Sequence, residues 1–224
     1  LDTIEALKHV KVSGVMASLS ICNVRESVLP RMSDCVFYTN VGVEVGVAST
    51  KAFTAQLVAL FVLANTLANV QNCLDSAQLS EHLKALKTLP SEITQALLTE
   101  ERLKTFATQI ARREHALYLG RGMFYPIAEE GALKLKEISY IHAESYPAGE
   151  LKHGPLALVD ESMPVIVLAP NDALLEKIWG NMHEVSARGG ELFVISDGGD
   201  FSDVDADHTL TLPETHPLLR PIVF

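Results

Sequence analysis

Hydrophobic and polar residues alternate along the second half of the chain in the pattern of an α/β fold. Short apolar runs bounded by glycine, proline or polar residues predict strands, and segments of helical periodicity separate them. The predicted strands are HALYLG (115–120), MPVIVLAP (163–170), ELFVISD (191–197) and DHTLTLP (207–213). One helix is predicted from about Pro126 to Ser145, with Pro126 in its first turn. Another is predicted from an N-cap at Asn171 or Asp172 to a stop at Gly189. This order predicts a parallel sheet with helices on both faces.

The first half of the chain repeats the end of that pattern. A predicted helix that stops at Gly14 is followed by the apolar runs SLSICNV (18–24) and DCVFYTN (34–40). Their starts are 16 residues apart, as are the starts of the last two predicted strands. The match indicates an internal duplication, with the alternative that two generic segments coincide. In a duplicated chain the first copy would lack its opening strand–helix–strand, which would precede Leu1.

Mostly helical segments connect the two copies. The segment 54–70 is apolar nearly all round but contains Gln56, Asn65 and Asn69. A membrane span needs about 20 mostly apolar residues, so we expect a helix buried between two sheets or against a partner subunit. Two further helices are predicted over 80–89 and 89–113. We therefore expect the C-terminal part of a first α/β domain over 1–75, connecting helices over 76–110 and a second domain over 111–224.

Composition narrows the function classes. The chain has 224 residues, of which 48% are hydrophobic and 21% charged, enough for a core of one or two domains. A formal net charge of −10 argues against nucleic acid or an anionic membrane as the main partner. The three cysteines form no CxxC pair, which suits buried thiols in a reducing cytoplasm better than disulfides or a zinc site. We recognise no signal peptide and expect a cytoplasmic protein.

Charged residues gather along one line of the predicted helix 126–145. At about 100° per residue, Glu130, Lys134, Glu137 and Glu144 fall within about 40° of one direction. Apolar residues border this line, and the opposite side, which includes Ala132, is expected to face water. Lys134 stands one turn from both Glu130 and Glu137. Such a cluster in a partly dry pocket lets a carboxylate act as a base, and the alternative is a solvated ladder of salt bridges.

The loop GELKHGP carries a second candidate. Gly149 and the pair Gly154–Pro155 indicate a constrained loop, and His153 lies within it. A histidine there can titrate near neutral pH and move protons. A structural or incidental role is the alternative.

A third candidate is the segment GVEVGVASTKAF (42–53), which follows a predicted strand. Ser49 or Thr50 can cap the apolar helix that begins there. A strand end, a glycine-containing turn and a helix start form a typical ligand edge in a parallel sheet, although capping alone also explains the pattern. The chain has no Walker loop and no GxGxxG, so nucleotide binding is not indicated.

Two blocks of sequence carry a family resemblance. TNVGVEVGVASTKAFTAQL and LGRGMFYPIAEEGALKLKEISYIHAESYPAGELKHGPLAL resemble the isomerase half of the glucosamine-6-phosphate synthase family, which consists of two sugar isomerase (SIS) domains. The resemblance spans essentially the whole chain. It implies two three-layer sandwiches with parallel sheets, the first truncated at its N-terminus and the second lacking its C-terminal helix and tail. It also implies conversion of fructose 6-phosphate and glutamine-derived ammonia to glucosamine 6-phosphate. A phosphosugar isomerase without amidotransfer and a phosphosugar-sensing module are the alternatives.

The same resemblance implies roles for individual residues. Glu137 matches the family's base, which carries a proton between C1 and C2 of the sugar. Lys134 matches a lysine that stabilises charge on the enediol-like intermediate, and Glu130 would orient it. His153 matches a histidine that assists ring opening and reaches the site from the neighbouring subunit of a dimer.

The resemblance also implies substrate contacts and partners. The backbone of Val47 and the hydroxyl of Ser49 match contacts to the sugar. We expect a homodimer, a glutaminase domain in the full-length chain, and neither a metal nor a cofactor. The family's phosphate-binding loop would precede Leu1 and its C-terminal tail would follow Phe224. We therefore expect this chain alone to be at best poorly active.

Overall fold

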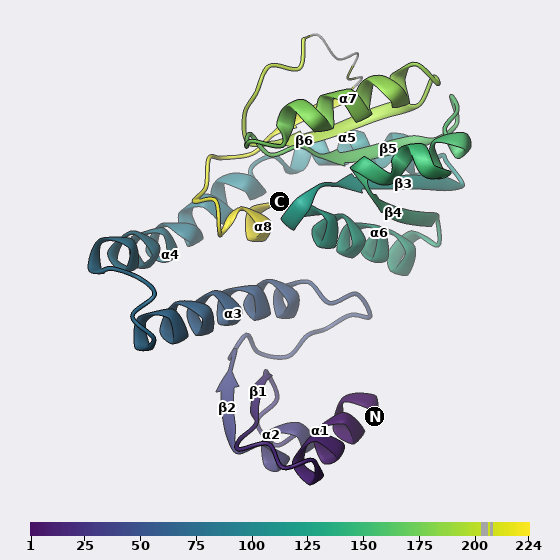
Figure 1. Ribbon diagram of the computed structural model, residues 1–224. Coiled ribbons are helices and arrows are strands. Elements are labelled where there is room, and N and C mark those ends of the chain that lie inside the picture. The colour runs from purple at the N-terminus through teal and green to yellow at the C-terminus, as the bar shows by residue number, and fades with distance from the viewer. Residues whose placement is uncertain (203–205, 207) are drawn as a thin grey trace. The chain divides into compact units, whose positions relative to one another are not determined.

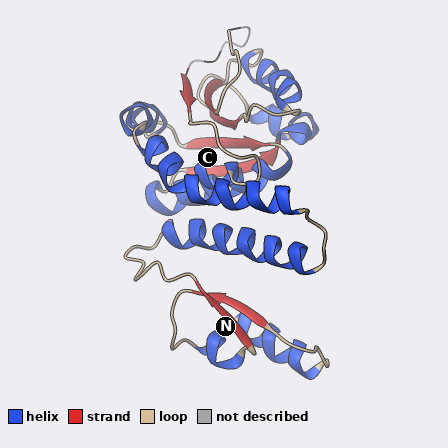
Figure 2. Ribbon diagram, turned by 90° about the vertical axis from the view of Figure 1, so that its left-hand side faces the viewer, coloured by secondary structure: helices blue, strands red, loops and turns tan. Residues whose placement is uncertain are grey.

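The computed structural model describes residues 1–202, 206 and 208–224. The chain divides into two compact units, Leu1–Leu79 (unit 1) and Ser80–Phe224 (unit 2). In each unit helices pack beside parallel strands (Figures 1 and 2). The predicted α/β class with parallel sheets flanked by helices is confirmed.

Unit 2 contains a five-stranded sheet in the order β4-β3-β5-β6-β7, and all neighbouring strands are parallel. Its strands are β3 (His115–Gly120), β4 (His142–Pro147), β5 (Pro164–Leu168), β6 (Glu191–Ser196) and β7 (His208–Thr211). Four of them occupy the predicted apolar runs, apart from Asp207, which lies outside the described residues. The order reverses direction at β3, because β4 lies on one side of it and β5 on the other.

The prediction of one helix from Pro126 to Ser145 is wrong beyond Ser139. Helix α6 covers Tyr125–Ser139, and Tyr140 then adopts a left-handed backbone with φ of 62°. The chain continues as β4, which pairs with β3 along its whole length and buries Ala143 completely. Strand pairing and burial against β3 decide this segment, so the local helical pattern does not.

Helices and short 3₁₀ turns cover both faces of the sheet in unit 2. Alternate residues of β3 point to opposite faces: Leu117 and Leu119 join the core on the α7 side, whereas Ala116 and Tyr118 join the core on the α5 and α6 side. Helices α5 (Glu100–Ile110) and α6 therefore lie on one face, and α7 (Leu175–Ser186) lies on the other (Figure 1). The remaining elements are η1 (Gly122–Phe124), η2 (Ala148–His153), η3 (Pro155–Leu158) and α8 (Arg220–Val223).

Two predicted helix boundaries require correction. Helix α4 covers Ser76–Leu97 and continues through Pro90, so the predicted break at residue 89 is wrong. The N-cap prediction for α7 is also wrong, because Asp172 accepts a hydrogen bond from the N–H of Leu174, at 2.7 Å, in the turn before the helix. The predicted stop at Gly189 is confirmed, with a left-handed φ of 80°.

Unit 1 contains a two-stranded parallel sheet. Its elements are α1 (Asp2–Val12), β1 (Leu19–Cys22), α2 (Val28–Met32), β2 (Cys35–Tyr38) and α3 (Lys51–Val70). The two strands pair as predicted for the first copy, with Leu19 opposite Cys35. The expectation of buried thiols is wrong for Cys35 and Cys73, which are exposed.

Helix α3 is less buried than its apolar sequence predicts. Ala59 is its only buried residue in this chain. Within the residues that the structure describes, α3 alone is long and apolar enough to cross a membrane by length and composition. Core helices of other proteins can be equally long and apolar, so one such helix is weak evidence for a membrane span.

Candidate active site

Small residues set the position of α6 against the sheet. Ala128 and Ala132 are buried there, and a Cβ on Gly131 would lie 2.9 Å from Cε1 of Tyr118 on β3. That distance is shorter than real Cβ contacts, so any larger residue at position 131 would force the ring of Tyr118 or the helix to shift. The side of α6 that includes Ala132 therefore faces the sheet. The expectation that water covers this side is wrong for Ala132, whereas Lys136 and Ser139 of the same side are exposed.

The charged cluster of α6 forms two ion pairs around one lysine. Nζ of Lys134 lies 2.8 Å from Oε2 of Glu137 and 3.3 Å from Oε1 of Glu130. The three side chains are between 20% and 28% exposed. The spacing along the helix thus brings the three predicted residues together. Their side chains are neither fully buried, as in a dry pocket, nor fully exposed, as in a solvated ladder of salt bridges.

Hydrogen bonding fixes the charge of the lysine. The pKa of Lys134 is raised above its ordinary value, chiefly by the hydrogen bond to Glu137. Burial opposes this effect, and Glu130 reinforces it through a hydrogen bond and its negative charge. Lys134 is therefore a firmly protonated ammonium that touches two carboxylates. The fourth charged residue of the predicted line, Glu144, lies on β4 instead of the helix and accepts a hydrogen bond from the hydroxyl of Tyr146.

His153 is the last residue of η2, and the two residues before it anchor the loop. Leu151 is fully buried in the core that includes α7, and Nζ of Lys152 forms an ion pair with Oε1 of Glu184 at 2.8 Å. Gly154 follows with a backbone φ of 141°, which residues other than glycine rarely adopt. The loop is constrained as predicted, and it presents an exposed imidazole.

The structure does not bring His153 to the charged cluster within one chain. Leu151 of η2 packs in the core on the α7 face of the sheet, whereas Ala132 of α6 packs in the core on the opposite face. The buried residues near His153 and Glu137 along the chain therefore pack on opposite faces of the sheet.

Val47 and Ser49 belong to unit 1, in the loop that joins β2 to α3. Val47 is 91% exposed, and Oγ of Ser49 donates a hydrogen bond to Oε2 of Glu44 at 3.4 Å. No side-chain cap comes from Thr50, which occupies the N-cap position. Instead, Glu44 accepts hydrogen bonds from the backbone N–H groups of Thr50, at 3.3 Å, and Ala52, at 3.0 Å.

Glu44 is a residue that the sequence pattern did not single out. Desolvation raises the pKa of its carboxyl group, but the N–H groups of Thr50 and Ala52 and the charge of Lys51 outweigh this effect, so the pKa is lowered. Helix capping is normally predicted from the residue at the N-cap position itself. Glu44, which accepts the backbone hydrogen bonds here, lies six residues before Thr50. Its carboxylate organises the loop that carries Val47 and Ser49.

Comparison with known proteins identifies the fold class. The SIS domain family matches residues 1–66 and 109–218. The chain therefore belongs to the SIS domain family. The two matched stretches contain both parallel sheets described above.

More specific similarity comes from curated relatives and a solved structure. The chain is 57% identical over all 224 residues to glutamine–fructose-6-phosphate aminotransferase (isomerizing) of Neisseria meningitidis serogroup B, and 54% identical to that of Xanthomonas campestris pv. campestris. It spans 37% of the length of either relative. The C-terminal domain of glucosamine-fructose-6-phosphate aminotransferase from Francisella tularensis superposes with a TM-score of 0.95 at 46% identity, over 100% of this chain and 63% of that one.

A second solved structure is similar at a greater distance. The putative phosphosugar isomerase of Silicibacter pomeroyi superposes with a TM-score of 0.76 at 28% identity. The alignment covers 97% of this chain and 62% of that one.

Proposed function

We propose that this chain is the sugar-phosphate isomerase portion of a glutamine–fructose-6-phosphate aminotransferase. The full-length protein would convert fructose 6-phosphate and glutamine-derived ammonia to glucosamine 6-phosphate. The observation that carries the proposal is the Glu130–Lys134–Glu137 cluster, found in a chain 57% identical over its whole length to a relative of that name. Because the chain spans 37% of that relative, the remainder would include the glutaminase domain.

In the proposed reaction Glu137 moves a proton between C1 and C2 of the open-chain sugar. Lys134 donates its hydrogen bond to Oε2, so Oε1 is the oxygen that takes the proton. The ammonium group of Lys134 stabilises negative charge that develops on the enediol-like intermediate, and hydrogen bonding keeps it protonated. Glu130 holds Lys134 from the other side. The exposure of about a quarter of each side chain suits a base that must meet a polar substrate.

His153 would assist ring opening from the neighbouring subunit of a homodimer. Two observations support this assignment. His153 is exposed, and Leu151 of its loop packs on the opposite face of the sheet from Ala132 of the helix that carries Glu137. The backbone of Val47 and the hydroxyl of Ser49 would contact the sugar. The loop that carries them is ordered by Glu44, which suits a role in holding a ligand.

A second candidate function is phosphosugar isomerisation without ammonia transfer. The similarity to the putative phosphosugar isomerase of Silicibacter pomeroyi favours it, because the proton-transfer cluster serves both reactions. A phosphosugar-sensing module of the same fold would not need Glu137 as a base.

The identity of the product distinguishes these functions. Full-length protein is supplied with fructose 6-phosphate, with and without glutamine, and the sugar phosphates are identified by mass spectrometry. Glucosamine 6-phosphate formed only with glutamine is the expected result. Glucose 6-phosphate as the sole product would establish the second candidate, and no product in either reaction would leave the sensing role.

A further inference from the structure

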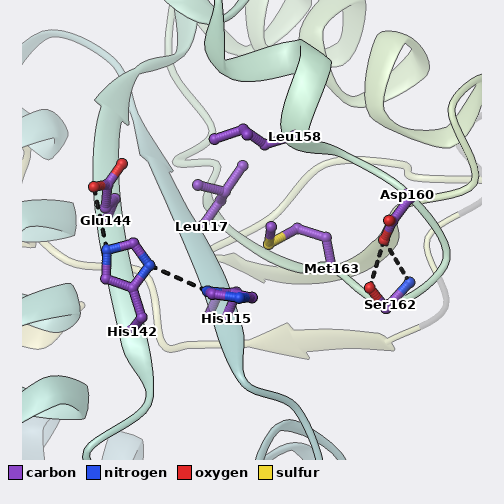
Figure 3. A pocket seen from close by; sticks show the side chains of 9 residues that line it. His115, Leu117, His142, Glu144, Leu158, Asp160, Ser162 and Met163 are labelled. Carbon is purple, nitrogen blue, oxygen red and sulfur yellow. Dashed lines mark hydrogen bonds and ion pairs between the residues drawn. The ribbon is translucent and has the colours of Figure 1, made fainter.

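A pair of histidines meets at one end of the sheet of unit 2, on strands that carry none of the catalytic or substrate-binding residues assigned above. His115 begins β3 and His142 begins β4, and the parallel register places them opposite each other. Their Nδ1 atoms are 3.2 Å apart, and their rings point toward one another from adjacent strands (Figure 3). The two residues are 27 positions apart in the sequence, so only the strand register brings them together.

A carboxylate fixes the orientation of one imidazole. Oε1 of Glu144 lies 3.3 Å from Nε2 of His142, and the other oxygen of Glu144 accepts the hydroxyl hydrogen of Tyr146. If Nε2 of His142 carries its proton toward Glu144, Nδ1 of the neutral ring presents a lone pair to His115. This carboxylate–histidine arrangement is the one that supports metal-binding histidines, because it sets the tautomer and raises the basicity of the free nitrogen.

The distance between the two nitrogen atoms fits one shared metal ion. Metal–nitrogen bonds of about 2.05 Å at a tetrahedral angle place two ligand nitrogens about 3.3 Å apart. The observed separation of 3.2 Å is close to this value. His115 needs only the tautomer with its proton on Nε2, and it is exposed to water that can accept that proton's hydrogen bond.

A cavity beside the pair leaves room for the remaining ligands. It has a volume of about 250 Å³, and its walls include Leu117, Leu158 and Met163. Asp160 lies across the cavity and is held by the N–H and hydroxyl of Ser162 (Figure 3). Hydrogen bonds from Ser162, and to a smaller extent the charges of Arg113 and His115, keep the pKa of Asp160 low. The wall thus keeps a permanent negative charge that favours a cation nearby.

We propose that His115 and His142 form a two-histidine site for a divalent transition-metal ion of the zinc class. Glu144 orients His142 from behind, and water or a small ligand in the cavity completes the coordination. No group of three or more histidine, cysteine or acidic residues in the described chain is arranged to hold a metal, so the protein supplies two ligands. Imidazole ligands suit Zn²⁺ and Cu²⁺, with Cu²⁺ bound more tightly. This site is independent of the proposed sugar chemistry.

Titration of the full-length protein with Zn²⁺ tests the site. Isothermal titration calorimetry should show one equivalent of Zn²⁺ that is lost in both His115→Gln and His142→Gln. Glu144→Gln should keep the equivalent but weaken it roughly 10-fold, the usual effect of losing such an outer partner. His183→Gln, which changes an exposed histidine on α7, is the matched control and should bind as the unchanged protein does.

A spectroscopic measurement avoids any effect of the variants on folding. Electron paramagnetic resonance of the unchanged protein with one equivalent of Cu²⁺ should show coupling to two imidazole nitrogens. Cu²⁺ without two nitrogen ligands would overturn the proposal. So would Zn²⁺ binding that is absent, or that persists in both His115→Gln and His142→Gln.

Discussion

The close contact between α6 and β3 leads to a prediction about two glycines in the middle of helices. Replacing glycine by alanine inside a helix gains about 0.8–1.0 kcal/mol of intrinsic helix preference. In α7, a Cβ added at Gly180 would have no atom within 4 Å apart from the neighbouring residues and backbone of its own helix, so Gly180→Ala should stabilise the chain by about the full gain in helix preference. In α6, the new Cβ at Gly131 would meet Cε1 of Tyr118 at 2.9 Å and Cδ1 at 3.1 Å.

The clash at Gly131 should cancel or exceed the gain in helix preference. Overpacking of this kind costs about 1–3 kcal/mol, so Gly131→Ala should lie between no net change and about 2 kcal/mol of destabilisation. The two alanine variants should then differ by about 1–3 kcal/mol. Urea denaturation of the purified variants, followed by circular dichroism, gives the comparison. If Gly131→Ala is as stabilising as Gly180→Ala, the ring of Tyr118 yields freely and the small residues do not fix the position of α6.

Three further predictions concern the charged and proton-moving residues. Lys134→Met should lower the free energy of unfolding, because it leaves two carboxylates without their cation. Because the pKa of Lys134 is raised in the folded protein, the difference in free energy of unfolding between the unchanged protein and the variant should be fully present below pH 10.5. It should be lost as the pH rises through the folded-state pKa of Lys134, and unfolding measured from pH 7 to 11 tests this. Glu44→Gln should destabilise the start of α3. Because the pKa of Glu44 is lowered in the folded protein, the difference in free energy of unfolding from the unchanged protein should be present above pH 4.5 and should disappear as the pH falls through the folded-state pKa. A difference that does not change with pH would contradict the capping role. Co-expression of full-length His153→Ala and Glu137→Gln chains should restore activity, since a hybrid dimer contains one site with both residues intact. Hybrids as inactive as either parent would place both residues of a site on one chain.

Local sequence patterns predict much of the fold. Three of the four apolar runs become β3, β5 and β6, in which most residues are buried against the neighbouring layers. The fourth becomes β7, which buries only Leu210, and all four runs can be recognised from local sequence alone. Strand β4 has a mixed sequence, HAESYP, that reads equally well as the end of a helix. Its pairing with β3 decides the outcome, and that pairing is a property of the assembled sheet.

The candidate site, like the fold, was predictable from the sequence only in part. Helical spacing alone brings Glu130, Lys134 and Glu137 together, and the ion pairs follow from it. Spacing cannot show that η2, which carries His153, and α6 pack on opposite faces of the sheet, since that depends on which face each connection takes. The capping role of Glu44 also depends on the path of a loop.

Proton transfer by Glu137 is the central claim, and exchange with solvent tests it directly. Full-length protein and its Glu137→Gln variant are incubated with fructose 6-phosphate and glutamine in D₂O. Nuclear magnetic resonance then follows deuterium at C1 and C2 of the substrate and product, and sugar-phosphate binding is measured separately. The account predicts that the variant binds the sugar phosphate but loses proton transfer by about 10²–10⁴-fold, the contribution of a positioned base. Transfer at an undiminished rate in Glu137→Gln would contradict it.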